Sequence, residues 1–97
     1  MRLSDIYCRI IKNEVKQIFG DNSQVFLFGS RVDDTKKGGD IDLYIETQNH
    51  YDIFNKKIEL LARLQQKLGE QQIDIVVNDF TQVKTIYTIA KNSGILL

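Results

Sequence analysis

Hydrophobic residues recur at steps of three and four positions in three stretches of the chain, which is the spacing of one face of an α-helix. These stretches predict helices over residues 4–19, 52–68 and 81–91. Gly69 follows the second stretch directly and is suited to end it. The apolar positions that define the three faces are Ile6, Tyr7, Ile10, Ile11, Val15, Ile18 and Phe19, then Phe54, Ile58, Leu61, Leu64 and Leu68, then Val83, Ile86, Tyr87 and Ala90.

Short polar residues and a glycine mark the ends of these helices. Ser4 or Asp5 can cap the first helix, because a side-chain oxygen there accepts a hydrogen bond from a free backbone N–H group. Gly20 stands where a residue in the left-handed conformation commonly ends a helix. Asp79 or Thr81 is available as the cap of the third helix.

Three short stretches rich in aromatic and β-branched residues predict strands over residues 24–28, 40–46 and 72–78. The order is helix, strand, loop, strand, helix, strand, helix, which predicts an α/β fold with a small mixed sheet covered by helices. The loop over residues 29–39 is too short for a crossover helix, so we expect the first two strands to be antiparallel. Residues 95–97 form an apolar tail that we expect to pack on the domain or on a partner.

The length of 97 residues corresponds to one domain, which we take as residues 1–97. Hydrophobic residues make up 42% and charged residues 27% of the chain, which excludes a disordered or low-complexity segment. No apolar run approaches the roughly 18 residues of a membrane span, and residues 1–9 lack the apolar core of a signal peptide. We therefore expect a cytoplasmic protein without membrane contact. Cys8 is the only cysteine, which excludes an internal disulfide.

The charged residues balance overall but are unevenly distributed. Thirteen basic and thirteen acidic residues cancel, whereas a protein that binds long nucleic acids usually carries a basic excess. We therefore expect no direct contact with nucleic acid. One short stretch is nevertheless dense in both signs of charge, which favours a small, highly charged ligand. It contains Arg31, Asp33, Asp34, Lys36, Lys37, Asp40 and Asp42.

Three aspartates lie in the predicted strands, although aspartate is depleted in strands. Asp40 and Asp42 are two positions apart, so their side chains share a face, with Cα atoms about 6.5–7 Å apart. Asp74 can converge on the same point if the two strands are neighbours. Carboxylates this close repel one another unless a cation holds them, and oxygen ligands suit Mg²⁺. Such a spacing can hold two ions about 3.5–4 Å apart, the separation used for in-line phosphoryl and nucleotidyl displacement. A solvated polar strand face is the alternative, and it explains one such aspartate better than three.

A Gly-Ser-Arg turn follows the first predicted strand. Gly29 allows the backbone to approach a phosphate closely, and Ser30 offers a hydroxyl and an amide as donors. Arg31, with Lys36 or Lys37, could neutralise phosphate charge, and an ordinary solvated loop is the alternative interpretation. A Gly-Ser pair alone is a weak signal. The pair followed by nine residues, then Asp-Ile-Asp, then a further strand with its own aspartate is a specific one.

Together, the segments 28–31 (FGSR), 39–43 (GDIDL) and 73–76 (IDIV) resemble the minimal nucleotidyltransferases of the DNA polymerase β superfamily. In particular, the chain resembles the antitoxin of HEPN/MNT toxin–antitoxin pairs, and the order of helices and strands agrees over nearly the whole length. The resemblance implies a polymerase-β-like fold, with a small mixed three-stranded core sheet and covering helices. Gly39 departs from the family pattern, because related antitoxins commonly have serine at this position.

The resemblance also implies an activity and a partner. The activity is transfer of AMP from ATP, with two Mg²⁺ ions, to a tyrosine hydroxyl of a HEPN ribonuclease toxin, with which the chain would form a hetero-oligomer. In this sequence Gly29 and Ser30 would hold the triphosphate. Asp40 and Asp42 would ligate both ions. Asp74 would complete the catalytic metal site and help to deprotonate the attacking hydroxyl.

Two other functions remain open. The chain could be a catalytically weak or inactive nucleotide- or toxin-binding module that neutralises a toxin by covering its active site. It could also transfer a nucleotide to a small molecule such as an aminoglycoside. Enzymes of that kind usually carry an added acceptor domain, for which 97 residues leave no room.

Overall fold

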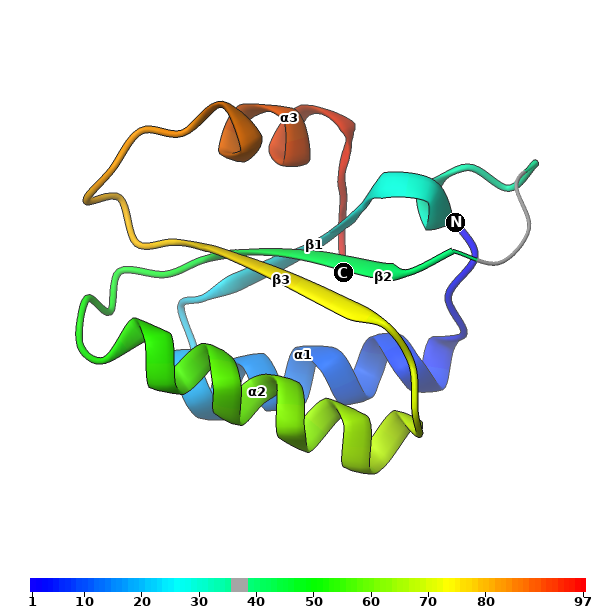
Figure 1. The fold of residues 1–97 in the computed structure, drawn as a ribbon, viewed down its shortest axis with the longest axis horizontal. Helices are drawn as coiled ribbons and strands as arrows, with labels where there is room; N and C mark the ends of the chain where they lie inside the picture. The colour runs from blue at the N-terminus through cyan, green and yellow to red at the C-terminus, as the bar shows by residue number, and fades with distance from the viewer. Residues whose placement is uncertain (36–38) are drawn as a thin grey trace.

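A mixed β-sheet lies between two helices on one face and a shorter helix on the other (Figure 1). The structure is a computed structural model that describes residues 1–35 and 39–97. Helices α1 (Asp5–Phe19) and α2 (Ile53–Leu68) cover one face, and α3 (Thr85–Ser93) lies on the opposite face. This confirms the predicted α/β architecture with covering helices. None of the helices in the described parts of the chain has the length and apolar character needed to cross a membrane.

The sheet has the strand order β3-β2-β1-β4. Its strands are β1 (Gln24–Phe28), β2 (Ile41–Glu46), β3 (Ile73–Asn78) and β4 (Ile95–Leu96). Strand β1 runs antiparallel to β2 and β4, whereas β2 and β3 are parallel. The antiparallel first pair and the mixed sheet are therefore confirmed. The predicted core of three strands gains a fourth, because the apolar tail folds back and pairs with β1.

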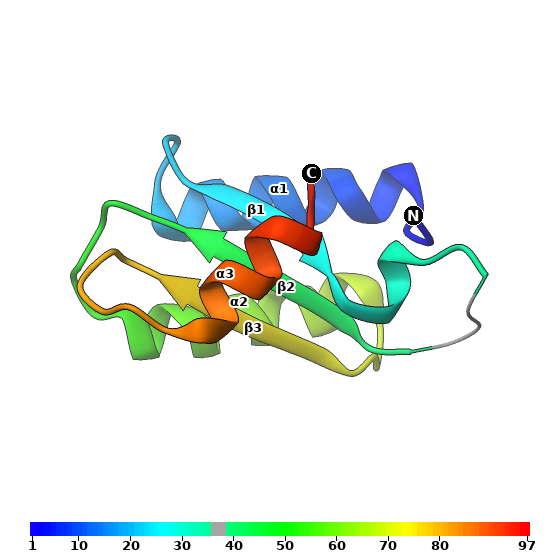
Figure 2. The same cartoon turned by 90° about the horizontal axis from the view of Figure 1, so that it is seen from above.

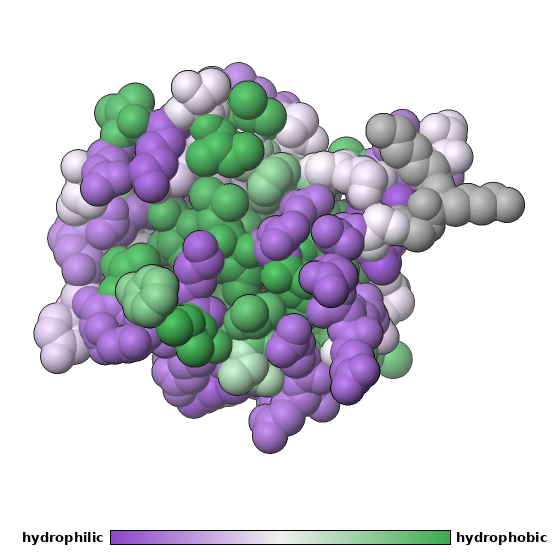
Figure 3. Space-filling view, viewed as in Figure 1, coloured by the Kyte–Doolittle hydropathy of each residue, from purple (hydrophilic) through white to green (hydrophobic). Residues whose placement is uncertain are grey.

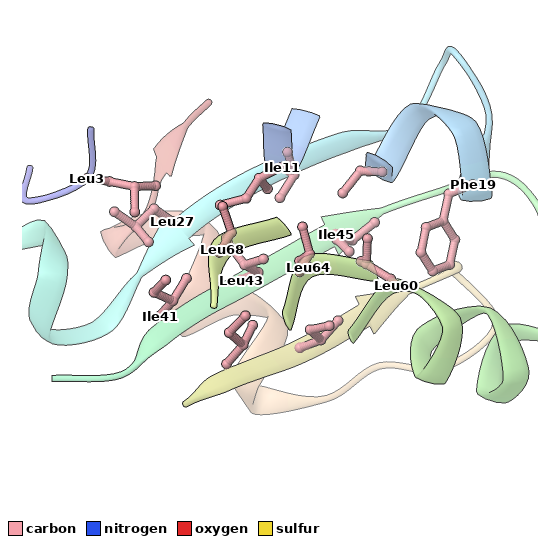
Figure 4. Close-up of a cluster of buried hydrophobic side chains, with 14 residues drawn as sticks. Leu3, Ile11, Phe19, Leu27, Ile41, Leu43, Ile45, Leu60, Leu64 and Leu68 are labelled. Carbon is pink, nitrogen blue, oxygen red and sulfur yellow. The ribbon is translucent and has the colours of Figure 1, made fainter. Parts of the chain in front are cut away.

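Alternation along the strands divides the sheet into two chemically different faces. In β2, Ile41, Leu43 and Ile45 are fully buried against α1 and α2. Asp42 and Tyr44 point to the opposite face, on which Tyr44 packs in a second, smaller cluster beneath α3. The main core lies between the sheet and the helices α1 and α2 (Figure 4). Its buried members are Leu3, Ile11, Val15, Phe19, Val25, Leu27, Ile41, Leu43, Ile45, Leu60, Leu64, Leu68, Ile73 and Ile75.

The ends of α1 are formed by the residues that the sequence indicates. The Oγ of Ser4 accepts a hydrogen bond from the backbone N–H of Tyr7 at 3.2 Å, so Ser4 is the N-cap. Gly20 ends the helix with a φ of 106°, and its N–H donates to the carbonyl of Lys16. Its ψ of 161° is extended, so the chain turns directly toward β1 and does not adopt the expected left-handed helical cap.

The buried face of α2 differs from the predicted one. The structure buries Leu60, Leu64 and Leu68, whereas Phe54 and Ile58 are 73% and 50% exposed. The apolar stripe is thus wider than the contact that α2 makes with α1 and the sheet. Since β3 is an edge strand, no element covers the outer side of the stripe in the described part of the chain. Of the five apolar positions named from the sequence, Leu61, Leu64 and Leu68 therefore pack in or against the core, and Phe54 and Ile58 do not.

The third helix begins later than the predicted span of residues 81–91. It starts at Thr85, and neither predicted cap residue caps it. The carboxylate of Asp79 instead accepts hydrogen bonds from the N–H and the hydroxyl of Thr81, which stabilises a turn at the point where the helix was expected to begin. Val83 is fully exposed in the loop that follows.

Candidate active site

The end of β1 and the starts of β2 and β3 form one row across the sheet. In the strand register, Phe28 pairs with Asp42, and Asp42 pairs with Asp74. A short 3₁₀ turn (Gly29–Val32) follows β1 and lies beyond its end, at the side of the sheet where β2 begins (Figure 2). The Gly-Ser turn and two of the three predicted aspartates are therefore neighbours in space.

Gly29 lies directly against the Asp42 carboxylate. A Cβ atom at Gly29 would collide with Oδ2 of Asp42, and its φ of +77° is one that side-chain-bearing residues rarely adopt. Only glycine lets the turn after β1 pass this close to the Asp42 carboxylate. The position of Asp42 is thus fixed by the backbone on one side and by β3 on the other.

The Asp42 carboxylate is held in an environment that disfavours its charge. Burial raises its pKa most, and the nearby charges of Asp74 and Asp40, together with a hydrogen bond to Asp74, raise that pKa further. Asp40 and Asp74 are themselves exposed. Asp40 lies one residue before β2 begins and not inside the strand as predicted. No described cationic side chain forms an ion pair with any of these three carboxylates.

These uncompensated carboxylates favour the binding of a cation through oxygen ligands. The carboxylates of Asp42 and Asp74 lie side by side, and the charge of Asp40 also repels that of Asp42. Asp40 and Asp74 are exposed, so a cation can reach them from solvent. In this conformation the described residues contain no ready group of three or more His, Cys, Asp or Glu side chains placed to hold a metal. The assignment of Asp40, Asp42 and Asp74 as ligands accordingly stays a prediction.

Ser30 is placed by a second glycine. A Cβ atom at Gly39 would overlap with its Oγ, and Gly39 has a φ of +93°. A serine at position 39, which is common in the resembling antitoxins, would therefore collide with Ser30 in this conformation. The departure from the family pattern has a local reason: the backbone at Gly39 lies directly against the Ser30 hydroxyl. The contact of Ser30 with a triphosphate stays a prediction.

Arg31 and the unpredicted Arg2 brace the turn. The guanidinium of Arg31 donates to the carbonyls of Gly39 and Arg2, each at 3.2 Å. Arg2 in turn donates to the carbonyls of Ser30 and Asp33, each at 3.0 Å, and its backbone N–H donates to Arg31. In this structure Arg31 joins the turn to Gly39 and to Arg2, and its contact with phosphate stays a prediction. The sequence carried no signal for Arg2, which stands outside every periodic pattern.

Lys36 and Lys37, the other predicted phosphate contacts, lie outside the described residues.

A buried polar network on the same face of the sheet was also missed by the sequence reasoning. Asn78 donates to Oη of Tyr44, Tyr44 donates to Glu46, and Lys91 of α3 donates to both Glu46 oxygens at 3.0 Å. Burial raises the pKa of Tyr44, so its hydroxyl remains a donor at neutral pH. The network anchors α3 over the ends of β2 and β3, while the row containing Asp42 stays accessible at the other end.

Residues 8–97 match the family model of the nucleotidyltransferase domain. A comparison with individually curated proteins gave no significant match. The match covers more than nine-tenths of the chain and includes every strand and the Gly-Ser turn. The chain therefore belongs to the nucleotidyltransferase domain family of the polymerase-β-like superfamily, and this membership indicates a nucleotidyl transfer activity. Members of this family typically use a nucleoside triphosphate and a divalent metal ion.

Proposed function

We propose that this chain is a Mg²⁺-dependent nucleotidyltransferase that transfers AMP from ATP to a tyrosine hydroxyl of a partner HEPN ribonuclease toxin, and so acts as an antitoxin. The observation that carries the catalytic part is the convergence of Gly29, Asp42 and Asp74 at one point of the sheet. The choice of acceptor rests on the resemblance of the FGSR, GDIDL and IDIV segments to HEPN/MNT antitoxins.

The turn after β1 is suited to bind a triphosphate. Gly29 brings the backbone close to Asp42 without a side chain in the way, and the hydroxyl and amide of Ser30 provide donors beside it. Arg2 and Arg31 hold the carbonyls of this loop, which keeps the turn ordered before the ligand arrives. A preorganised donor set of this kind lowers the entropic cost of binding.

Two Mg²⁺ ions held by Asp40 and Asp42, with Asp74 completing one site, would neutralise the charge of the triphosphate and of the leaving group. In the transfer itself, the acceptor oxygen attacks the α-phosphorus of ATP. The new P–O bond forms as the bond from the α-phosphorus to the bridging oxygen breaks, and pyrophosphate leaves. The hydroxyl proton passes to the carboxylate of Asp74, which is exposed at the start of β3 and open to an incoming acceptor.

The experiment is a transfer assay with the candidate toxin. The purified chain, Mg²⁺ and ATP labelled at the α-phosphate are incubated with a HEPN protein encoded next to it, and the products are mapped by mass spectrometry. We expect AMP on a tyrosine of the partner. An unmodified partner that is nevertheless bound and silenced would refute protein nucleotidylation.

A binding module without catalysis is the second candidate, and the lack of a ready three-carboxylate group among the described residues is the observation in its favour. The doubly substituted Asp40→Asn, Asp42→Asn chain separates the two. Loss of protection with an intact complex supports catalysis. Protection that survives in this variant supports neutralisation by binding alone.

A further inference from the structure

An apolar surface runs along the free edge of β3. Figure 3 shows apolar side chains gathered over β3 and the adjoining side of α2, with polar side chains around them. A groove of about 420 Å³ lies here, lined by Phe54, Ile58 and Leu61 of α2 and by residues 73–76 of β3. A second groove of about 480 Å³ adjoins it and shares Phe54 and Lys57. We call the two together the β3-edge groove. An apolar patch with a polar rim is typical of an interaction site.

The backbone of β3 offers hydrogen bonds to this groove. The N–H of Ile41 donates to the carbonyl of Gln72, and the N–H of Thr47 donates to the carbonyl of Asn78, so the backbone N–H and C=O groups of even-numbered β3 residues point toward β2. The backbone groups of residues 73, 75 and 77 consequently point away from β2, toward the free edge. The outward carbonyl of Val77 accepts a hydrogen bond from Oη of Tyr87 at 3.1 Å.

The outward backbone groups of Ile73 and Ile75 have no strand beside them in the described part of the chain, because β3 pairs only with β2. An extended polypeptide satisfies such groups, and apolar side chains at alternate positions then fit the flanking groove.

We propose that the β3-edge groove binds an extended segment of the acceptor protein, which adds to the sheet as a strand beside β3 and carries the acceptor hydroxyl to Asp74. This inference rests on the proposed function. Its basis is that Asp74 lines the groove and also contacts Asp42 in the site, so one carboxylate belongs to both. A segment lying along the edge therefore passes the catalytic row.

The chemistry of the groove selects a polypeptide over the other occupants. A nucleotide is a poor fit, because the lining beside residues 73–76 is mostly apolar and contains a single cation, Lys57. A second copy of the chain seated here would cover Asp74, which the transfer needs open. Lys57, Lys84 and Asp79 line the outer part of the groove. Because the Asp79 carboxylate already accepts hydrogen bonds from Thr81, the two lysines set the preference, and the bound segment is expected to carry acidic residues near its end.

Two matched isoleucines provide the kinetic test. Ile58 on α2 is 50% exposed in the groove, and Ile6 on α1 is 65% exposed outside it. The acceptor is the protein that the wild-type chain labels with AMP. We expect Ile58→Glu to raise the KM for that acceptor at least tenfold, while kcat and the binding of Mg-ATP stay unchanged, and Ile6→Glu to behave as wild type. The milder Ile58→Ala should give a smaller change in the same direction.

Contact and edge pairing are tested directly. A photo-crosslinking amino acid at position 54 should crosslink to the acceptor near the nucleotidylated residue, and one at position 6 should not. In the complex, the amide protons of Ile73 and Ile75 should exchange more slowly than in the free chain. Crosslinks to a second copy, unchanged exchange at both amides, or full transfer by Ile58→Glu would overturn the docking surface. If no protein accepts AMP from the wild type, the proposed function fails, and this inference fails with it.

Discussion

Replacement of Asp42 by asparagine should stabilise the metal-free protein. Asp42 and Asp74 are register partners on adjacent parallel strands, and strands of a sheet lie about 4.8 Å apart. Two like charges about 5 Å apart repel by roughly 0.8 kcal/mol at a dielectric constant near 80 and by roughly 3 kcal/mol near 20. Because Asp74 is exposed, solvent screens the pair and the lower end applies, so we expect a gain of about 1 kcal/mol.

The pH dependence of this gain has a definite sign. The pKa of Asp42 is raised in the folded state, so folding disfavours its charged form. The penalty is fully present above the folded pKa and vanishes below the unfolded value. The stability difference between Asp42→Asn and wild type should therefore be largest at neutral pH and disappear as the pH falls toward the ordinary range of an aspartate.

Thermal unfolding with a chelator present measures the effect. For a chain of this size, about 1 kcal/mol corresponds to a rise of about 4–8 °C in Tm. Asp21→Asn is the matched control, because Asp21 is an exposed turn aspartate, and its Tm should stay close to that of wild type. Added Mg²⁺ should raise the Tm of wild type and have much less effect on Asp42→Asn. A variant that melts at or below the wild-type temperature in the chelator would refute the repulsion between these carboxylates.

Four further substitutions test other parts of the structure. Gly29→Ala should abolish transfer, since its Cβ would displace the Asp42 carboxylate, and circular dichroism should show a fold that is retained but less stable. Asp74→Ala should abolish transfer in a labelled-ATP assay while calorimetry shows nearly unchanged ATP binding; intact turnover would remove Asp74 from the mechanism. Ser30→Ala should weaken triphosphate binding by about 1.5–3 kcal/mol, the value of one hydrogen bond to a charged group. Glu14→Ala should lower the free energy of unfolding by about 1–3 kcal/mol, because the Glu14 side chain is 2% exposed and pairs with Lys67 and Arg63. The Lys67 hydrogen bond lowers the pKa of Glu14, so this loss should be present at neutral pH and fade as the pH falls through that pKa, as urea titrations would show.

The strands and the approach of the aspartates were predictable because both depend on local rules. The period of two in the DIDLYIE and QIDIVVN segments fixes which residues share a face, and the short loop after β1 fixes the antiparallel pair. Once β2 and β3 are adjacent, the register that buries Ile41 beside Ile73 also places Asp42 beside Asp74. The same pattern thus positions both the core and the site.

The buried face of α2 and the role of Arg2 could not be predicted from the sequence, because both depend on tertiary packing. Leu60 and Leu61 are adjacent leucines, and either can continue the apolar stripe of α2. Only the fit against α1 and the sheet buries the first fully and leaves the second partly exposed. Arg2 lies 28 residues from Ser30 in sequence, and its bracing hydrogen bonds exist only after the whole domain has folded.

Two carboxylates on β2 lie in opposite electrostatic environments, and the difference indicates why the site should bind a ligand. Glu46 and Asp42 lie four residues apart on the same face of one strand. Glu46 is 8% exposed and receives hydrogen bonds from Lys91 and Tyr44. Asp42, in a partly buried position, faces another carboxylate and has no described cationic partner.

The fold is therefore able to neutralise an acid on this face and does so where α3 is anchored. At the other end of the same strand it holds like charges together, at a cost in stability. Sites that break local rules in this way are expected where function requires it, since a cation and a triphosphate would supply the missing compensation. We therefore predict that Asp74→Lys, which offers Asp42 a partner of opposite charge from an exposed position, gives a fold at least as stable as wild type that no longer responds to Mg²⁺ in a thermal shift assay. A marked loss of stability would contradict the repulsion between these two carboxylates.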